Sequence, residues 1–119
     1  MTFTEKIEDI LPEIDIDTGL MYCGDDEELF EEVVGEFIDG EMTASIEENY
    51  ENENWENYQI QVHAVKGTSL TIGAKKLHEE AMDIEQSVKK GDVDFAKEHH
   101  EAFMSHYKNV LEGLKRCIE

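Results

Sequence analysis

Apolar residues recur at intervals of three and four along most of the chain, the spacing that places them on one face of an α-helix. Eight of them lie between residues 29 and 46: Leu29, Phe30, Val33, Val34, Phe37, Ile38, Met42 and Ile46. They predict an amphipathic helix that continues to about Tyr50. Asp25, with Glu28 three positions later, has the spacing of a capping box at the start of this helix.

The remaining pattern predicts three more helices. Asn52-Glu53-Asn54 marks a break, a second helix extends from about Trp55 to Ile72, and Gly73 interrupts it. A narrow apolar seam follows at steps of three and four: Ala74, Leu77, Ala81, Ile84 and Val88. Gly91-Asp92 combines a helix stop with the next N-cap. The last helix is lined by Phe103, Tyr107, Val110, Leu114 and Cys117.

Helices joined by such short connections must be antiparallel neighbours. We therefore predict an all-α fold, an antiparallel up-down-up-down four-helix bundle. The segment before Asp25 is predicted to add one or two short helices that cover one end. With no long linker, low-complexity tail or internal repeat, we expect a single domain over residues 1–119, with 1–24 as the N-terminal cover and 25–119 as the bundle.

The composition of the chain argues against several classes of function. The 119 residues hold 10 Lys and Arg against 30 Asp and Glu, a net charge of −20, which would repel nucleic acids and anionic membranes. No apolar run approaches the length of a membrane span, and the N-terminus does not resemble a signal peptide. Cys23 and Cys117 lack metal or redox spacing, and we interpret them as buried or boundary thiols. We expect a cytoplasmic, monomeric protein.

One window departs from this acidic background. Residues 57–78 contain no Asp or Glu but carry Lys66, Lys75 and Lys76, so the window has a charge of +3 and the other 97 residues carry −23. Such a positive island indicates either an anionic partner or simply a buried helix.

On a helical wheel, His63 points away from the apolar stripe of its helix. That stripe comprises Tyr58, Val62, Val65, Ser69 and Ile72. Lys66, at i+3, is placed to neutralise a charge on His63, and Gly67, at i+4, clears space beside the ring at a cost of about 1 kcal/mol of helix propensity. Gln59, Ile60 and Leu70 surround the same ring and are candidates for a small docking patch.

These residues carry a family resemblance. The run from His63 through Lys66, Gly67 and Gly73 to Leu77 resembles the signature of histidine-containing phosphotransfer (HPt) domains, His-x-x-Lys-Gly followed by small residues and a glycine before the next helix. Upstream, residues 16–20 and 25–30 resemble the lead-in to the first long helix of such domains. The resemblance extends over nearly the whole chain.

The resemblance implies a phosphocarrier in a multistep His-Asp phosphorelay. His63 would accept a phosphoryl group from a receiver-domain aspartate and pass it to another receiver, while Lys66 balances the phosphoryl charge and Gly67 admits the partner. In this family a Glu or Gln on the following helix often faces the ring. Glu85 occupies that position, as an orienting group or as a solvated carboxylate. Leu70 stands where many members have a small residue.

The resemblance also sets expectations about cofactors and partners. We expect no cofactor on this chain, because the Mg²⁺ for transfer would be bound by the partner receiver domain. The partners would be receivers of response regulators or hybrid histidine kinases. The chain has no ATP-binding segment, so we expect a phosphotransfer intermediate and not an enzyme.

Other functions fit the sequence less well. His78, His99, His100 and His106 form no metal-binding motif; His100 falls near the core stripe of the last helix, and each of the four is predicted to be a boundary or surface residue. The stretch after Asp15 lacks the Gly and the closing Glu of a calcium loop, and no serine lies in a hydrolase-type turn. A helical adaptor that binds receivers without carrying phosphate is the alternative, and an acidic nucleic-acid mimic is a third possibility.

Overall fold

A computed structural model describes all 119 residues and contains seven helices and no strand. In chain order the helices are α1 (Phe3–Ile10), α2 (Ile16–Tyr22), α3 (Glu27–Asp39), α4 (Thr43–Glu51), α5 (Trp55–Thr71), α6 (Lys75–Lys89) and α7 (Val93–Ile118). None of them combines the length and the apolar character that a membrane span requires.

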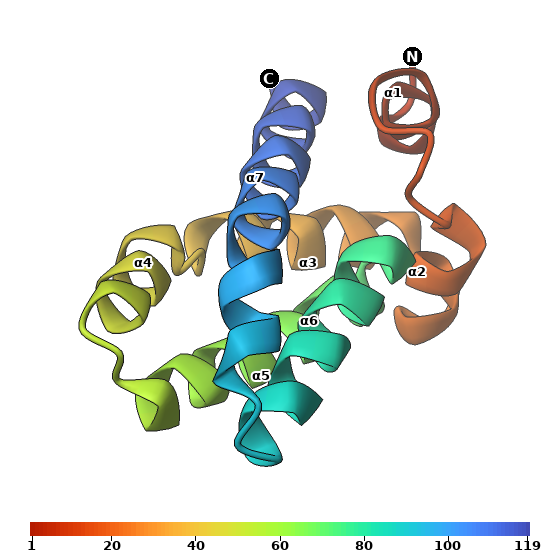
Figure 1. Cartoon of the computed structure of the whole chain (residues 1–119). Coiled ribbons are helices and arrows are strands. Elements are labelled where there is room, and N and C mark those ends of the chain that lie inside the picture. The colour runs from red at the N-terminus through yellow and green to blue at the C-terminus, as the bar shows by residue number, and fades with distance from the viewer.

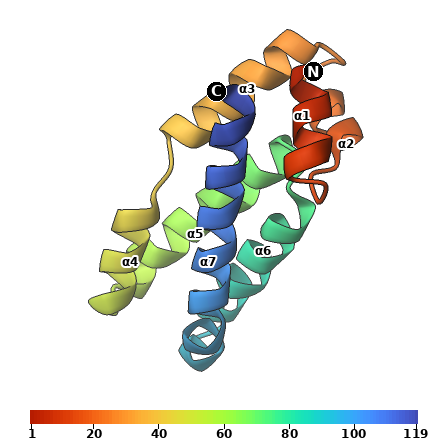
Figure 2. The same cartoon turned by 90° about the horizontal axis from the view of Figure 1, so that it is seen from above.

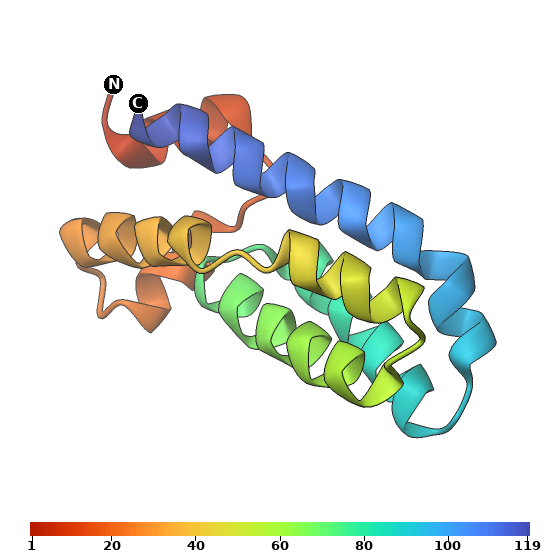
Figure 3. The same cartoon turned by 90° about the vertical axis from the view of Figure 1, so that its left-hand side faces the viewer.

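The predicted all-α bundle is confirmed, and its four helices are α4 to α7; α3, which was predicted to be part of the first of them, is a separate helix that packs on α7. The pair α5 and α6 makes the most extensive contact, and α6 also packs on α7, the longest helix (Figure 1). Seen from the side, α7 extends along one edge of the molecule and α5 along the opposite edge, with α4 and α6 between them (Figure 3). This arrangement leaves one face of α5 uncovered.

Two short N-terminal helices cover one end of the bundle, which confirms the prediction for the segment before Asp25. Helix α1 packs on the C-terminal part of α7, and α2 packs on α5 and α3 (Figure 2). The cover contributes Ile7, Leu11 and Ile14 to the core, where each is at most 6% exposed.

The predicted apolar seams form the core of the bundle. The buried members on α5, α6 and α7 are Tyr58, Val62, Val65, Ser69, Leu77, Ala81, Ile84, Phe103, Tyr107, Val110, Leu114 and Cys117. Both cysteines are free and buried, and burial raises the pKa of each thiol. These thiols are therefore packing residues.

The single helix predicted from Asp25 to about Tyr50 is wrong, because the chain breaks at residues 40–42 into α3 and α4. A carboxylate oxygen of Glu41 accepts hydrogen bonds from the backbone N–H and the hydroxyl of Thr43, the first residue of α4, at 2.7 and 2.6 Å. The Tyr107 hydroxyl accepts a bond from Met42 N at 3.2 Å. These polar groups stabilise the break, and the spacing of apolar residues does not reveal them.

The predicted cap at Asp25 is also displaced by one residue. Asp26 caps α3, with its carboxylate accepting from the N–H groups of Glu28 and Leu29. Asp25 adopts a left-handed backbone (φ 61°) in the turn after α2. The reciprocal capping box of this chain lies instead at Thr2 and Glu5, at the start of α1.

Gly73 fixes the geometry of the turn between α5 and α6. Its φ of +84° favours glycine, and a Cβ there would lie 2.1 Å from the carbonyl oxygen of Asp15. The two residues are paired through the backbone, since Asp15 N donates to Gly73 O at 2.8 Å. Lys75 adds an ion pair to Asp15 at 2.9 Å. The N-terminal cover is thus fastened to the end of α5.

Candidate functional site

His63 lies on the uncovered face of α5, one helical position after the buried Val62. Its side chain is 61% exposed, as the wheel predicted, while the stripe opposite it is buried. The packing of α5 against α6 therefore presents an imidazole to solvent on a rigid helix.

Glu85 reaches His63 from α6. Its side chain is 2% exposed, and one carboxylate oxygen, Oε2, is hydrogen-bonded to Nδ1 of His63. The other oxygen, Oε1, accepts a bond from Nζ of Lys66 at 2.7 Å. The structure thus brings His63, Lys66 and Glu85 together and leaves Nε2 of His63 without a partner.

The charge on Glu85 follows from these neighbours. Burial alone would raise the pKa of the Glu85 carboxyl, but hydrogen bonds from Lys66 and His63 and their charges outweigh it, so the pKa is lowered. An ionised carboxylate only accepts hydrogen bonds, so Nδ1 of His63 carries the proton. In the neutral imidazole Nε2 then holds the lone pair, and this nitrogen has no partner in the chain. This is the arrangement of a nucleophile.

The structure also places two residues near the site that the sequence analysis did not assign to it. Nζ of Lys89 lies 3.6 Å from Oε2 of Glu85, and the Glu-Lys spacing of four residues was the signal available for this pair. Nδ1 of His78 is 2.7 Å from the carbonyl oxygen of Lys66, so His78 ties α6 to α5 beside the site. The buried carboxylate of Glu85 is therefore surrounded by Lys66, Lys89 and His63.

The surface around the ring matches the candidate docking patch only in part. Ile60 is 58% exposed, whereas Gln59 and Leu70 are half-buried. A Cβ added to Gly67 would meet no atom within 4 Å, so this glycine is not required by packing within the chain. Space beside His63 is open on the side of Gly67.

The positive island is partly neutralised within the fold. Lys66 is paired with Glu85 and Lys75 with Asp15, while Lys76 is exposed and has no ion pair. The first pair joins α5 to α6, and the second joins the start of α6 to the N-terminal cover.

The other histidines differ from His63. The prediction of a boundary or surface position is wrong for His100, which is 4% exposed and packs in the core. Its Nδ1 is 2.9 Å from the Tyr58 hydroxyl, and its ring stacks on Tyr50 with centroids 3.6 Å apart. His99 is exposed on α7, with Nδ1 2.9 Å from a carbonyl of its own helix. His106 is half-buried between two carboxylates.

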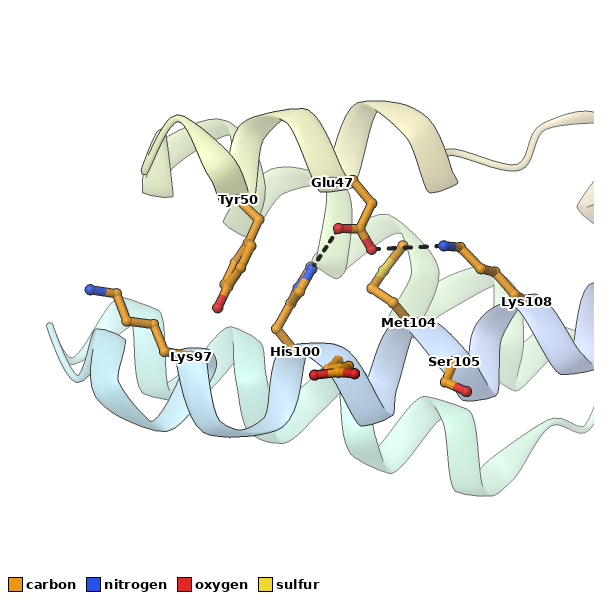
Figure 4. A pocket seen from close by; sticks show the side chains of 8 residues that line it. Glu47, Tyr50, Lys97, His100, Met104, Ser105 and Lys108 are labelled. Atoms are coloured by element: carbon orange, nitrogen blue, oxygen red, sulfur yellow. Dashed lines mark hydrogen bonds and ion pairs between the residues drawn. The ribbon is translucent and has the colours of Figure 1, made fainter.

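A pocket between α4 and α7 is separate from His63 (Figure 4). Its lining residue Glu47 lies between Nε2 of His100, at 3.2 Å, and Nζ of Lys108, at 3.9 Å. Lys97, on its rim, pairs with Glu53 at 3.2 Å. These groups are occupied in joining neighbouring segments, and no group of three or more His, Cys, Asp or Glu side chains is arranged to hold a metal ion.

Comparison with known proteins identifies the family. The model of the Hpt domain matches residues 28–117, which is most of the chain and includes the whole His63 site. No curated protein and no solved structure matches the chain. The all-helical bundle, with an outward histidine on its α5–α6 hairpin, agrees with this match. The chain therefore belongs to the Hpt domain family.

Proposed function

We propose that this chain is a histidine phosphocarrier in a His-Asp phosphorelay and that His63 is its phosphoacceptor. One observation carries the proposal: His63 is an exposed imidazole whose Nδ1 is held by a buried carboxylate and whose Nε2 is free. Membership of the Hpt family supports phosphotransfer as the general role.

The reaction follows from the tautomer. The Nε2 lone pair of His63 attacks the phosphorus of a receiver's aspartyl phosphate, and the bond from phosphorus to the aspartate oxygen breaks. The aspartate leaves as a carboxylate, and the ring becomes an imidazolium that retains its Nδ1 proton. Glu85 lies against that proton and stabilises the positive ring. Transfer to a second receiver reverses these steps. The receiver supplies the Mg²⁺.

The neighbouring residues have separate roles in this proposal. Lys66, 25% exposed beside Glu85, balances the charge of the phosphoryl group. Gly67 leaves room for the receiver, and Gln59, Ile60 and Leu70 contribute to the docking face. We propose that the contact is small and transient, because a carrier must release one receiver before it meets the next.

The proposal is tested with a panel of receivers carrying radioactive phosphate on their aspartates. Incubation with the chain should transfer label that is alkali-stable and acid-labile, as expected of phosphohistidine. His63→Gln should abolish labelling, and the matched variant His99→Gln, which removes another exposed histidine, should not.

Two results would contradict the proposal. Labelling that survives His63→Gln would place the phosphate elsewhere. Stable binding of receivers with no transfer to the chain would show instead a helical adaptor. Circular dichroism of both variants should remain helical, because neither side chain is in the core.

A further inference from the structure

A second histidine, His106 on α7, joins three segments of the fold. Its side chain is 15% exposed, and Nε2 lies 2.6 Å from Oε1 of Glu13, in the connection between α1 and α2. Nδ1 contacts Oε1 of Glu80 on α6. The two carboxylates therefore bind opposite edges of the ring, each at a different nitrogen.

This geometry requires a proton on each ring nitrogen. A carboxylate only accepts hydrogen bonds, and a neutral imidazole has a single N–H, so both bonds exist together only when His106 is an imidazolium. Burial alone would lower the pKa of His106, but the hydrogen bonds to Glu80 and Glu13 and their charges outweigh it, so the pKa lies above its ordinary value of 6.5.

Neither Glu13 nor Glu80 is ion-paired with a lysine or an arginine, and His99, which lines a pocket with Glu80, bonds to a carbonyl of its own helix. Glu13 and Glu80 are the charged groups that act on the ring. One turn away along α6 from Glu80 are the exposed Lys76 and Asp83, one of each sign. On α7 itself, the residues one turn from His106 are uncharged: Ala102, Phe103, Asn109 and Val110.

The other attachments of the α1–α2 connection are insensitive to pH near neutrality. Leu11 and Ile14 are held by burial, and Asp15 is held by its backbone bond to Gly73 and its ion pair with Lys75. Side chains of these types do not change charge between about pH 5 and 8, whereas histidine does.

We propose that His106 is a pH-sensitive latch that holds the connection between α1 and α2 on the bundle. As an imidazolium it binds both carboxylates. When the proton leaves to solvent, the ring keeps one N–H for Glu80, whose position is fixed on α6, and Glu13 is released. The attachment is complete at mildly acidic pH and weakens as pH rises through the titration of His106. This proposal is independent of phosphate transfer at His63.

The test is NMR of the full chain between pH 5 and 9. The His106 ring resonances give its titration midpoint, and the Asp15 amide, which donates to Gly73, reports how firmly the connection is attached. Hydrogen exchange of that amide is corrected for the intrinsic effect of pH. We expect its protection to fall by about two- to fivefold above the His106 midpoint, as for loss of one partly exposed ion pair.

Two variants and a control distinguish the latch from ordinary packing. Glu13→Gln should lower the His106 midpoint, and His106→Gln should remove the pH-dependent step in protection. His99→Gln, on the same helix, should change neither. If the Asp15 protection factor is independent of pH in the parent, or if Glu13→Gln leaves the His106 midpoint where it was, the latch does not exist.

Discussion

His63 and His100 show how one chain uses the same side chain in two ways. Each contacts a glutamate, but the His63 side chain is 61% exposed and uses one nitrogen, whereas the His100 side chain is 5% exposed and uses both. His100 is also stacked on Tyr50. Neither a histidine nor a His-Glu contact therefore marks a reactive site by itself. The proposed site at His63 is distinguished by an exposed ring whose Nδ1 is bonded to Glu85 and whose Nε2 is free.

The largest expected effect concerns access to His63. Gly67→Gln should abolish phosphate transfer, because a long side chain one turn from the imidazole would block the receiver. The thermal midpoint should stay the same or rise, since glutamine has the higher helix propensity and the added Cβ meets nothing. Transfer rate and thermal midpoint are measured on the same preparation.

Gly35→Gln is the matched control for this variant. Gly35 lies within α3, and an added Cβ there also meets no atom within 4 Å. The Gly35→Gln variant should be stabilised in the same way as Gly67→Gln and should transfer phosphate at the parent rate. Equal rates for Gly67→Gln and Gly35→Gln would show that the open side of His63 is not the approach route.

Lys66→Ala should shorten the lifetime of phosphohistidine or slow transfer roughly tenfold, the lower part of the range for a charge-assisted hydrogen bond. The measurement is the decay of the labelled chain at low ionic strength. Lys76→Ala, which removes an exposed and unpaired lysine of the same window, should have no effect. A Lys66→Ala chain that transfers and hydrolyses like the parent would remove Lys66 from the site.

The same substitution, to leucine, is made separately at His63 and at His100. His100→Leu should lower the free energy of unfolding by about 2 kcal/mol, because it leaves the buried Tyr58 hydroxyl without its partner. His63→Leu should change it by less than about 0.5 kcal/mol. Urea denaturation measures both. For phosphate acceptance we expect the opposite: His63→Leu should lower it more than His100→Leu does. Equal free energies of unfolding for the two variants would contradict the distinction between the two histidines.

The smallest effect is the pH dependence of Glu85. Because the pKa of this carboxyl is lowered in the folded state, its charge stabilises the fold above the ordinary value of 4.5, and the contribution is lost as pH falls through the folded value. Glu85→Gln should therefore cost about 1 kcal/mol at pH 7 and progressively less in acid. Glu79→Gln, exposed on the same helix, should cost less than about 0.5 kcal/mol at pH 7 and in acid. A cost that does not change with pH would contradict an ionised Glu85.

Much of the fold was predictable because the spacing of apolar residues and the capping residues at helix starts indicate the same helices. The helices over residues 55–71 and 93–118 begin after Asn54 and Asp92, whose side chains cap them. The break at residues 40–42 was not predictable, because the apolar spacing continues across it. The Tyr107 hydroxyl, which accepts a hydrogen bond from Met42 N at the break, lies 65 residues away in sequence.

The candidate site shows the same limit. The outward position of His63 and the open space at Gly67 follow from helix geometry alone. The burial of Glu85 and its simultaneous contacts with His63 and Lys66 depend on how closely α6 packs on α5, which no spacing along one helix determines. The contact between His106 and Glu13 joins residues 93 positions apart, and no local pattern indicates it.

The most direct measurement of the central claim is mapping of the phosphate after transfer from a receiver. The labelled chain is digested under alkaline conditions that preserve phosphohistidine, and the peptides are sequenced by mass spectrometry. We expect phosphate on the peptide containing His63 and on no other. Phosphate on His78, His99, His100 or His106, with His63 unmodified, would contradict it.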